Sequence, residues 1–427
     1  MSINKIRQTL GRFSHWVCAL SQKRVWDQTI GYWIVAATIL IITIPTTHYV
    51  ESDVPQLVHA RQWLFQKLGE WTPRPLSPRY VKVVMIDDDD YWKGEPRGAV
   101  PLNREYLAKL VHALDDANAA IIALDVNETL TDPDHPEFDL TKATDRLMQE
   151  IARAAEKRTI VLAKVFSGNS FALARDIFQP YGICTHASRA GQWENPGSSK
   201  LPHLSMEAKR NIVCGFVAMP RRSEQVPPQI SVEGEHYPID SFSLAIARAW
   251  SPTDAEVLAQ SERYTDYISM KTLNKDGVIL SARQVLTGDP VSRHLVRFRP
   301  VIIGGNWHAD GYYMGRYVDT HDTPIGPMRG AIINENYTEA ILDGRLSTGL
   351  PSKVLYTLEV LAAVGATLLF AKYANIWAKV TLLMGAMIGL VLGQWLIFTL
   401  FGVYFEAFLP LVGLSIHSIF TRLIGEP

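Results

Sequence analysis

Residues 81–87 read VKVVMID, residues 103–118 read NREYLAKLVHALDDAN, and residues 119–126 read AAIIALDV. The first and third segments are short, rich in aliphatic residues and close on an aspartate, which is typical of buried strands. The middle segment, with Asn103 as a plausible N-cap, repeats apolar residues on one helical face, namely Leu107, Leu110, Val111 and Leu114. A strand, a helix and a strand in this order predict a parallel sheet with right-handed crossovers.

The alternation of strand and helix patterns continues through the polar middle of the chain. Further strands are expected from Thr159, at 211–219 and at 301–307, and further helices near 142–157 and at 241–250, 281–288 and 331–343. Residues 166–210 carry no pattern that assigns structure. We therefore predict an α/β domain with a mostly parallel sheet and crossover helices.

Apolar segments flank this polar region on both sides. Their lengths suit a hydrocarbon core of ~30 Å, so we predict transmembrane helices at 30–50, 350–371, 380–401 and 404–421. The positive-inside rule places the basic amphipathic leader, 1–29, and the loop with Lys372 and Lys379 in the cytoplasm, together with the tail 422–427. Residues 51–349 then form an extracytoplasmic domain, in the periplasm or extracellular space, on a bacterial inner membrane.

Composition argues against two classes of function. The 42 Lys and Arg residues balance 43 Asp and Glu residues, and the net charge is −1. A protein that binds nucleic acid needs a basic surface to neutralise phosphates, so no nucleic-acid partner is expected. The sequence has no GxSxG, Walker or HExxH motif, and we do not predict an enzyme.

Two of the three cysteines belong to the predicted outer domain. Cys184 and Cys214 would share an oxidising compartment, whereas Cys18 would lie on the reducing side. A disulfide between Cys184 and Cys214 is one interpretation. Two separate buried thiols are the other, because apolar residues flank Cys214.

The first predicted strand ends in four consecutive acids, Asp87, Asp88, Asp89 and Asp90. Asp125 ends a neighbouring strand, and ligands of open α/β sheets bind at the carboxyl ends of strands. Such carboxylates could hold Mg²⁺ or Ca²⁺, but a solvated turn in which one aspartate caps the loop is the favoured interpretation. Arg104 is expected to form a structural ion pair with one of these acids.

A second polar group follows the strand at 301–307 and consists of His308, Asp310, Asp319, His321 and Asp322. These residue types bind Zn²⁺ or Fe²⁺, but the spacing matches no known ligand pattern and the intervening tyrosines indicate an ordinary long loop. Gly304 and Gly305 are interpreted as a backbone turn. We assign no metal or cofactor, and the ligand-binding candidates are Asp87, Asp88, Arg104, Asp125, His308 and Asp310.

The chain resembles the CHASE-type sensor modules of the second type, the cyclase- and histidine-kinase-associated extracellular sensing domains. The resemblance covers residues 80–345 and rests on five segments in order: VVMIDDDD, VPLNREYLAKLVHAL, AAIIALDV, ILSARQVLTGD and VIIGGNW. One span before the domain and three after it are also the family's usual layout. Asn334 stands where the family usually has histidine. The family usually carries a cytoplasmic cyclase or kinase after the last span, so the resemblance implies an input module without its output domain.

These patterns and the resemblance together predict a membrane-anchored sensor. Its outer domain would bind a small molecule or a protein, and its helices would signal to a separately encoded cytoplasmic effector in a homodimer or a hetero-complex. A structural scaffold subunit of an envelope complex is the alternative. A metal-dependent enzyme in the outer domain is a third, less favoured hypothesis.

Overall fold

The computed structural model describes residues 24–25, 28–29, 55–71, 80–99, 102–126, 140–165, 205–219, 225–227, 229–230, 238–252, 263–265, 278–323, 326–344, 346–350, 353–354, 357, 361 and 376–404. The chain divides into two compact units. The larger unit spans Arg74–Ser347, and the other combines Met1–Pro73 with Thr348–Pro427.

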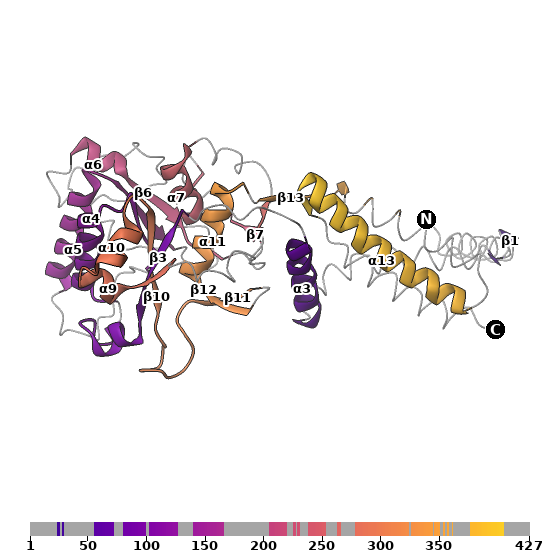
Figure 1. The fold of residues 1–427 in the computed structure, drawn as a ribbon, viewed down its shortest axis with the longest axis horizontal. Helices are drawn as coiled ribbons and strands as arrows, with labels where there is room; N and C mark the ends of the chain where they lie inside the picture. The colour runs from indigo at the N-terminus through magenta and orange to yellow at the C-terminus, as the bar shows by residue number, and fades with distance from the viewer. Residues whose placement is uncertain are drawn as a thin grey trace, which may run out of the picture. The chain divides into compact units, whose positions relative to one another are not determined.

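The larger unit is built on a six-stranded parallel sheet with the order β6-β5-β4-β10-β3-β9 (Figure 1). Its strands are β3 (Lys82–Asp87), β4 (Ile121–Leu124), β5 (Thr159–Lys164), β6 (Ile212–Phe216), β9 (Ile279–Ser281) and β10 (Pro300–Asn306). β10 pairs with both β3 and β4, so that Ile303 lies opposite Val84 on one side and Leu124 on the other. The last strand in sequence is thus inserted between the first two.

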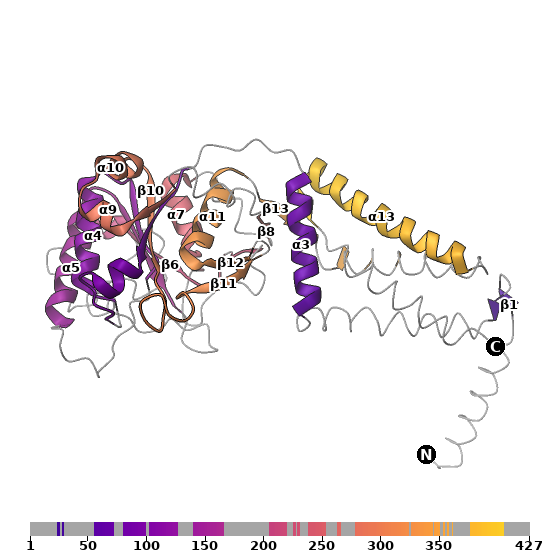
Figure 2. The same ribbon diagram turned by 60° about the horizontal axis from the view of Figure 1, so that its bottom comes forward.

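Helices cover both faces of this sheet, because successive strand residues point to opposite sides. In β3, Val84 and Ile86 belong to one hydrophobic cluster, and Val83 and Met85 belong to another. The first face carries α4 (Arg104–Asp116), α5 (Leu140–Ala155), α6 (Met206–Asn211), α9 (Ala282–Leu286) and α10 (Pro290–Val296). The second face carries α7 (Phe242–Trp250) and α11 (Gly330–Leu342), which completes three layers (Figures 1 and 2).

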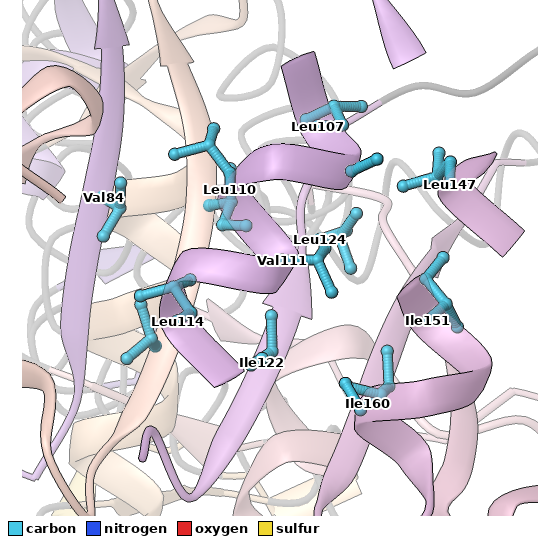
Figure 3. Packing of buried hydrophobic residues seen from close by; sticks show 14 of the residues in the cluster. Val84, Leu107, Leu110, Val111, Leu114, Ile122, Leu124, Leu147, Ile151 and Ile160 are labelled. Atoms are coloured by element: carbon cyan, nitrogen blue, oxygen red, sulfur yellow. The ribbon is translucent and has the colours of Figure 1, made fainter. Parts of the chain in front are cut away.

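Helix α4 forms as the sequence pattern predicts. The side chain of Asn103 caps it by accepting hydrogen bonds from the backbone N–H groups of Glu105 and Tyr106. Its apolar face is fully buried in one cluster with side chains of β4 and α5 (Figure 3). The members of this face are Leu107, Leu110, Val111 and Leu114.

The other strands and helices expected in this unit are confirmed to within a few residues. The interpretation of Gly304 and Gly305 as a turn is wrong, because both lie inside β10. A Cβ atom at position 304 would collide with the Cβ of Ala331 in α11, and one at position 305 would lie 2.6 Å from the Trp307 ring. These glycines therefore let a helix and an indole approach the strand closely.

Several short elements were not predicted. A π-helical turn, η1 (Asp89–Lys93), follows β3, and an antiparallel hairpin of β11 (Thr320–Thr323) and β12 (Gly326–Arg329) leads into α11. Asp289 caps α10, because its side chain accepts a hydrogen bond from the backbone N–H of Ser292. The helix itself begins with Pro290. β7 (Gln225–Val226) and β8 (Arg263–Tyr264) pair antiparallel.

The second unit contains α3 (Pro55–Trp71) and α13 (Ile376–Phe401). The Phe65 ring of α3 lies 6.3 Å from the Phe398 ring and 4.7 Å from the Tyr404 ring, both edge to face. The indole N–H of Trp395 donates to the carbonyl of Trp71 at 3.3 Å. Two strand pairs complete the described part: β13 (Ser347–Gly349) with β14 (Val403–Tyr404), and β1 (Arg24–Val25) with β2 (Gln28–Thr29).

The predicted membrane segments are covered unevenly. The leader 1–29 and the predicted spans 30–50, 350–371 and 404–421 lie outside the described residues except at isolated positions, and the predicted span 380–401 falls within α13. Among the residues that the structure describes, no helix combines the length and the hydropathy that a membrane span requires.

Cys214 lies in β6 and is disulfide-bonded. The other cysteines of the chain, Cys18 and Cys184, lie outside the described residues. The bonded state favours the disulfide interpretation for Cys214, and its pairing with Cys184 stays a prediction.

Candidate functional site

The carboxyl ends of three neighbouring strands gather polar side chains at one edge of the sheet, which we call the carboxyl edge. β3 ends at Asp87 and is followed by Asp88, β4 is followed by Asp125, and β10 is followed by His308 after one residue. Because β10 lies between β3 and β4, the segments that follow these strands meet there.

Asp88 holds the segment that follows β10. Its Oδ1 accepts a hydrogen bond from the backbone N–H of His308 at 2.9 Å, and its Oδ2 lies 2.6 Å from His308 Nδ1. The two side chains are 4% and 13% exposed. The indole N–H of Trp92 donates to the His308 carbonyl at 3.1 Å. Asp88 and Trp92 therefore fix His308 at the end of β3.

Residues 307–318, which we call the projecting loop, extend away from the sheet between β10 and β11 (Figures 1 and 2). The two ends of the loop are joined, because the N–H of Val318 donates to the carbonyl of Trp307 at 3.0 Å. The side chains of Tyr313 and Met314 at its tip are 61% and 58% exposed. The loop thus has an anchored base and a solvent-exposed apolar tip.

A second contact attaches the projecting loop to η1. The Tyr312 hydroxyl donates to Asp89 Oδ1 at 2.7 Å, and the Lys93 ammonium lies 3.5 Å from the centre of the Tyr312 ring. The hydrogen bond from Tyr312, followed by that from Lys93, lowers the pKa of the exposed Asp89 carboxyl. Asp89 is therefore an ionised acceptor in this contact.

A series of ring contacts connects His308 with the start of α11. The Tyr317 ring lies 3.9 Å from the His308 ring, and the Arg329 guanidinium lies 3.6 Å from the centre of the Tyr317 ring. Arg329 is the residue directly before α11. Burial lowers the pKa of Arg329, while Tyr317 and the charge of Asp88 oppose that shift. The end of β3 is thus linked through the side chains of His308, Tyr317 and Arg329 to a helix on the second face.

Asp125 is linked to the same helix by hydrogen bonds. Its Oδ2 accepts from the Asn334 amide at 2.8 Å, and the Ser243 hydroxyl of α7 donates to Asn334 Oδ1 at 3.0 Å. Asn334 and Ser243 are buried. Asn334 therefore joins β4, α7 and α11 in one polar network.

A second carboxylate, Asp319, lies near Asp125. The Oδ1 atom of Asp319 lies 2.8 Å from His321 Nε2. The carboxylate also lies against Gly330, the first residue of α11, where a Cβ atom would collide with it. Burial and then the charge of Asp319 raise the pKa of Asp125 to about 7. The hydrogen bond to Asp319 raises the pKa of His321, and burial opposes it. Protons are therefore held more tightly by Asp125 and His321 than by the same groups in water.

A family model, described as the CHASE2 domain, matches residues 34–371, which is well over half of the chain. The chain belongs to the CHASE2 domain family. The resemblance seen in the sequence is thereby confirmed, and CHASE2 domains are extracytoplasmic sensor modules. No curated protein and no solved structure gives a significant match.

In this CHASE2 domain the structure brings Asp88 and His308 into direct contact and places Asp125 on the other side of β10. Asp87 Oδ1 accepts from the backbone N–H of Asp90 at 2.9 Å, as expected of an aspartate that caps a turn. Asp310 lies apart from them, next to Gly315 within the projecting loop.

The predicted ion pair between Arg104 and the four aspartates is wrong for the described residues, among which no such pair is found. Arg104 instead donates from Nη1 to the Thr144 hydroxyl of α5 at 2.6 Å, and its side chain is buried in the helix layer. Arg104 therefore ties α4 to α5 and takes no described part in the carboxyl edge.

The metal alternatives gain no support from the described part of the CHASE2 domain. No group of three or more His, Cys, Asp or Glu side chains there is arranged to hold a metal ion. The His308 and His321 rings are each bonded to a single aspartate, Asp88 and Asp319 respectively.

Sequence reasoning missed the residues that connect the candidate acids, namely Trp92, Tyr312, Tyr317, Arg329 and Asn334. The aromatic residues in YYMGRY and the replacement of the family's histidine by Asn334 were the available signals. Neither signal shows which strand end the side chains of these residues contact.

We expect Asp125→Asn to raise the free energy of unfolding of the CHASE2 domain at pH 8 by roughly 2 to 4 kcal/mol. The pKa of Asp125 is raised from 3.8 to about 7 on folding. In the wild type, the contribution of Asp125 to the free energy of unfolding therefore decreases as pH rises from about 4 to about 7, because the folded state binds the Asp125 proton more tightly than the unfolded state does. Asparagine keeps an oxygen for Asn334 but carries no charge. Urea unfolding of the full chain in detergent, at pH 5 and pH 8, measures the effect.

The matched control is Glu207→Gln, which neutralises an exposed carboxylate on α6. It should leave the pH dependence unchanged. Equal pH dependence in wild type and Asp125→Asn would contradict the assignment of a raised pKa to Asp125.

Proposed function

We propose that the chain is a membrane-anchored sensor whose CHASE2 domain binds its ligand at the carboxyl edge and signals to a cytoplasmic effector. The observation that carries this proposal is the connected array from Asp88 through His308, Tyr317 and Arg329 to α11. A ligand that displaces one member changes the contacts of the others. The array thus offers two arrangements that binding can bias.

The charges at the carboxyl edge favour a cationic or proton-donating ligand over an anionic one. Carboxylates outnumber fixed positive charges among the described residues there. The acids are Asp87, Asp88, Asp89, Asp90, Asp125, Asp319 and Asp322, and the bases that act on them include Lys93, Arg283 and Arg329. An anion entering this field would be repelled, whereas an amine would be attracted.

The contact between α3 and α13 supports the proposed topology. α3 begins five residues after the predicted span 30–50, and it contacts the carboxyl-terminal end of α13 through the rings of Phe65, Phe398 and Tyr404. If α13 crosses the membrane from the cytoplasmic loop with Lys372 and Lys379, that end lies on the outer side, where α3 must also lie. Both predictions rest on the positive-inside rule, and together they place α3 and this end of α13 on the outer side in our proposal.

Signal transfer in this proposal uses the helices on both sides of the domain. Ligand binding shifts the membrane helices within a homodimer or a hetero-complex, and the shift is read by a cytoplasmic effector. The multi-pass arrangement in a bacterial inner membrane, with the large domain in the periplasm or extracellular space, belongs to the same proposal.

Purification of the tagged full chain from membranes in mild detergent tests this function. We expect a cytoplasmic kinase, cyclase or other effector to copurify, with an activity that changes when His308→Ala breaks the array. The amount of effector recovered should stay the same, because His308 is outside the part that holds the effector.

Glu207→Gln is the control and should match wild type in both amount and activity of the effector. A constitutive complex whose effector activity ignores His308→Ala would favour the scaffold alternative. A partner-free protein would contradict the sensor proposal.

A further inference from the structure

The strands of the six-stranded sheet begin at the edge opposite to the carboxyl edge, and we call the turns that precede these strands the amino edge. The starts of β3, β4 and β10 lie side by side there. Lys82 of β3 pairs with Val301 of β10, and Ile121 of β4 pairs with Pro300 of β10. The turn before β10, which contains Phe298, is therefore next to the point where the chain enters β3.

The chain enters and leaves the CHASE2 domain fold at this same edge. Glu339, near the end of α11, accepts a hydrogen bond at Oε1 from the backbone N–H of Val81 at 2.6 Å, directly before β3. The predicted span 350–371 begins eight positions after Leu342, the last residue of α11, and that stretch of chain reaches at most roughly 30 Å. In the membrane-anchored topology of the proposed function, on which this inference rests, we therefore expect the amino edge near the outer surface of the membrane.

Phe298 is an exposed aromatic residue in an unfavourable backbone conformation. Its side chain is 61% exposed, and its φ of 56° lies in the left-handed region, where bulky side chains are rare. Its backbone N–H donates to the carbonyl of Asn118, in the turn before β4, at 2.8 Å. The guanidinium of Arg297 lies 4.8 Å from the centre of the Phe298 ring. The turn thus presents an apolar ring and a positive charge together.

Further aromatic and basic side chains lie along the amino edge. The rings of Tyr80, which precedes β3, and of Trp250, which ends α7, are half-buried and lie 6.5 Å apart. In the described turns before β4, β5, β6 and β10, the bases are Lys157, Lys209, Arg210, Arg297 and Arg299, the exposed acids are Asp116 and Glu156, and Arg158 is paired with the buried Asp115. Aromatic rings combined with an excess of basic side chains are typical of protein surfaces at a membrane interface.

We propose that the amino edge docks on the outer surface of the membrane, with Phe298 in the interfacial layer and the exposed bases Arg297 and Lys157 on the phosphates of anionic lipids. Burial of the ring and attraction between opposite charges stabilise this contact by two separate effects. The contact orients the domain, because the carboxyl edge and the projecting loop then face away from the lipid. A ligand from the surrounding solution can reach the carboxyl edge in this orientation.

Hydroxyl-radical footprinting of the wild-type full chain in lipid nanodiscs, read by mass spectrometry, tests the proposal. The discs contain either phosphatidylcholine alone or phosphatidylcholine with about 30% phosphatidylglycerol, an anionic lipid. Tyr313 is the internal reference, because it is also an aromatic residue with 61% exposure and lies at the tip of the projecting loop. Oxidation of Phe298 relative to Tyr313 should be at least about fivefold lower in the anionic discs, since each base near a charged surface strengthens binding about fivefold.

A charge-neutralising variant separates the role of the lipid charge from that of the ring. Arg297→Gln keeps Phe298 and should return most of its oxidation in the anionic discs towards the level in the neutral discs. The matched control is Arg316→Gln, which removes an exposed base of the projecting loop. It should behave as wild type, because the projecting loop lies at the opposite edge of the sheet.

Equal relative oxidation of Phe298 in the two kinds of disc would overturn the inference, and this result needs no variant to fold. Low oxidation in both would mean that something other than anionic lipid, such as a second copy of the chain, covers the turn, and high oxidation in both would leave Phe298 in water. Arg297→Gln with the lipid dependence of the wild type would also contradict the proposal. These results leave the sensor proposal standing, because it is tested through the effector, whereas a chain that does not enter the discs would contradict the membrane anchor of the proposed function itself.

Discussion

Asp88→Ala is expected to lower the free energy of unfolding of the CHASE2 domain by about 3 kcal/mol and to detach the projecting loop. The Asp88 carboxylate is almost fully buried and accepts from both the backbone and the ring of His308. Its removal leaves the N–H and Nδ1 of a largely buried histidine without their acceptor, and this costs more than an exposed bond would. Urea unfolding of the full chain and hydrogen exchange of residues 307–318 measure the two effects.

The neighbouring residue provides the matched comparison. Asp89 is exposed and accepts from Tyr312 at 2.7 Å, so Asp89→Ala should change stability far less while still freeing Tyr312. If the two alanine variants were equally mild, Asp88 would not be the main anchor of the projecting loop.

Gly304→Ala is expected to have an effect of at least similar size, with a loss of about 3 kcal/mol or more. The new methyl group would overlap the Cβ of Ala331, which belongs to α11 and cannot move without shifting the helix away from β10. Both residues lie in the layer between the sheet and α11, where alternate positions of β10 are buried. Thermal unfolding of the full chain measures the loss.

A second substitution distinguishes this collision from a general intolerance of β10. Ala331→Gly removes the group that the new methyl would strike, so the double variant Gly304→Ala/Ala331→Gly should recover much of the lost stability. Ala331→Gly alone should cost roughly 1 kcal/mol, as glycine does in a helix. No recovery in the double variant would show that the two positions do not collide.

Most of the sheet and its helices could be predicted from local patterns. VKVVMID became β3, and the repeat of Leu107, Leu110 and Leu114 became the buried face of α4 with Asn103 as its cap. Elements without such a pattern were missed. η1 consists of acids and aromatic residues, and the hairpin of β11 and β12 is too short for a period to show.

The candidate site was predicted only in part. Asp87, Asp88, Asp125 and His308 do lie at the carboxyl ends of neighbouring strands, because every strand of a parallel sheet ends at the same edge. Arg104 was placed wrongly, since its position in the first turn of α4 directs it to Thr144 of α5. Its sequence distance from the aspartates carried no information about this orientation.

The periodicity of apolar residues and the polar residues at the strand ends were sufficient to predict the α/β class, the order of the elements and the edge where polar side chains gather. These three features depend on residues that are near one another in the chain. The partners at that edge depend on the insertion of β10 between β3 and β4, which joins segments more than two hundred residues apart. Burial then separates the roles of chemically identical groups. Asp88 is a buried anchor, Asp89 an exposed acceptor and Asp90 an acid with a raised pKa, although the three stand side by side in the sequence.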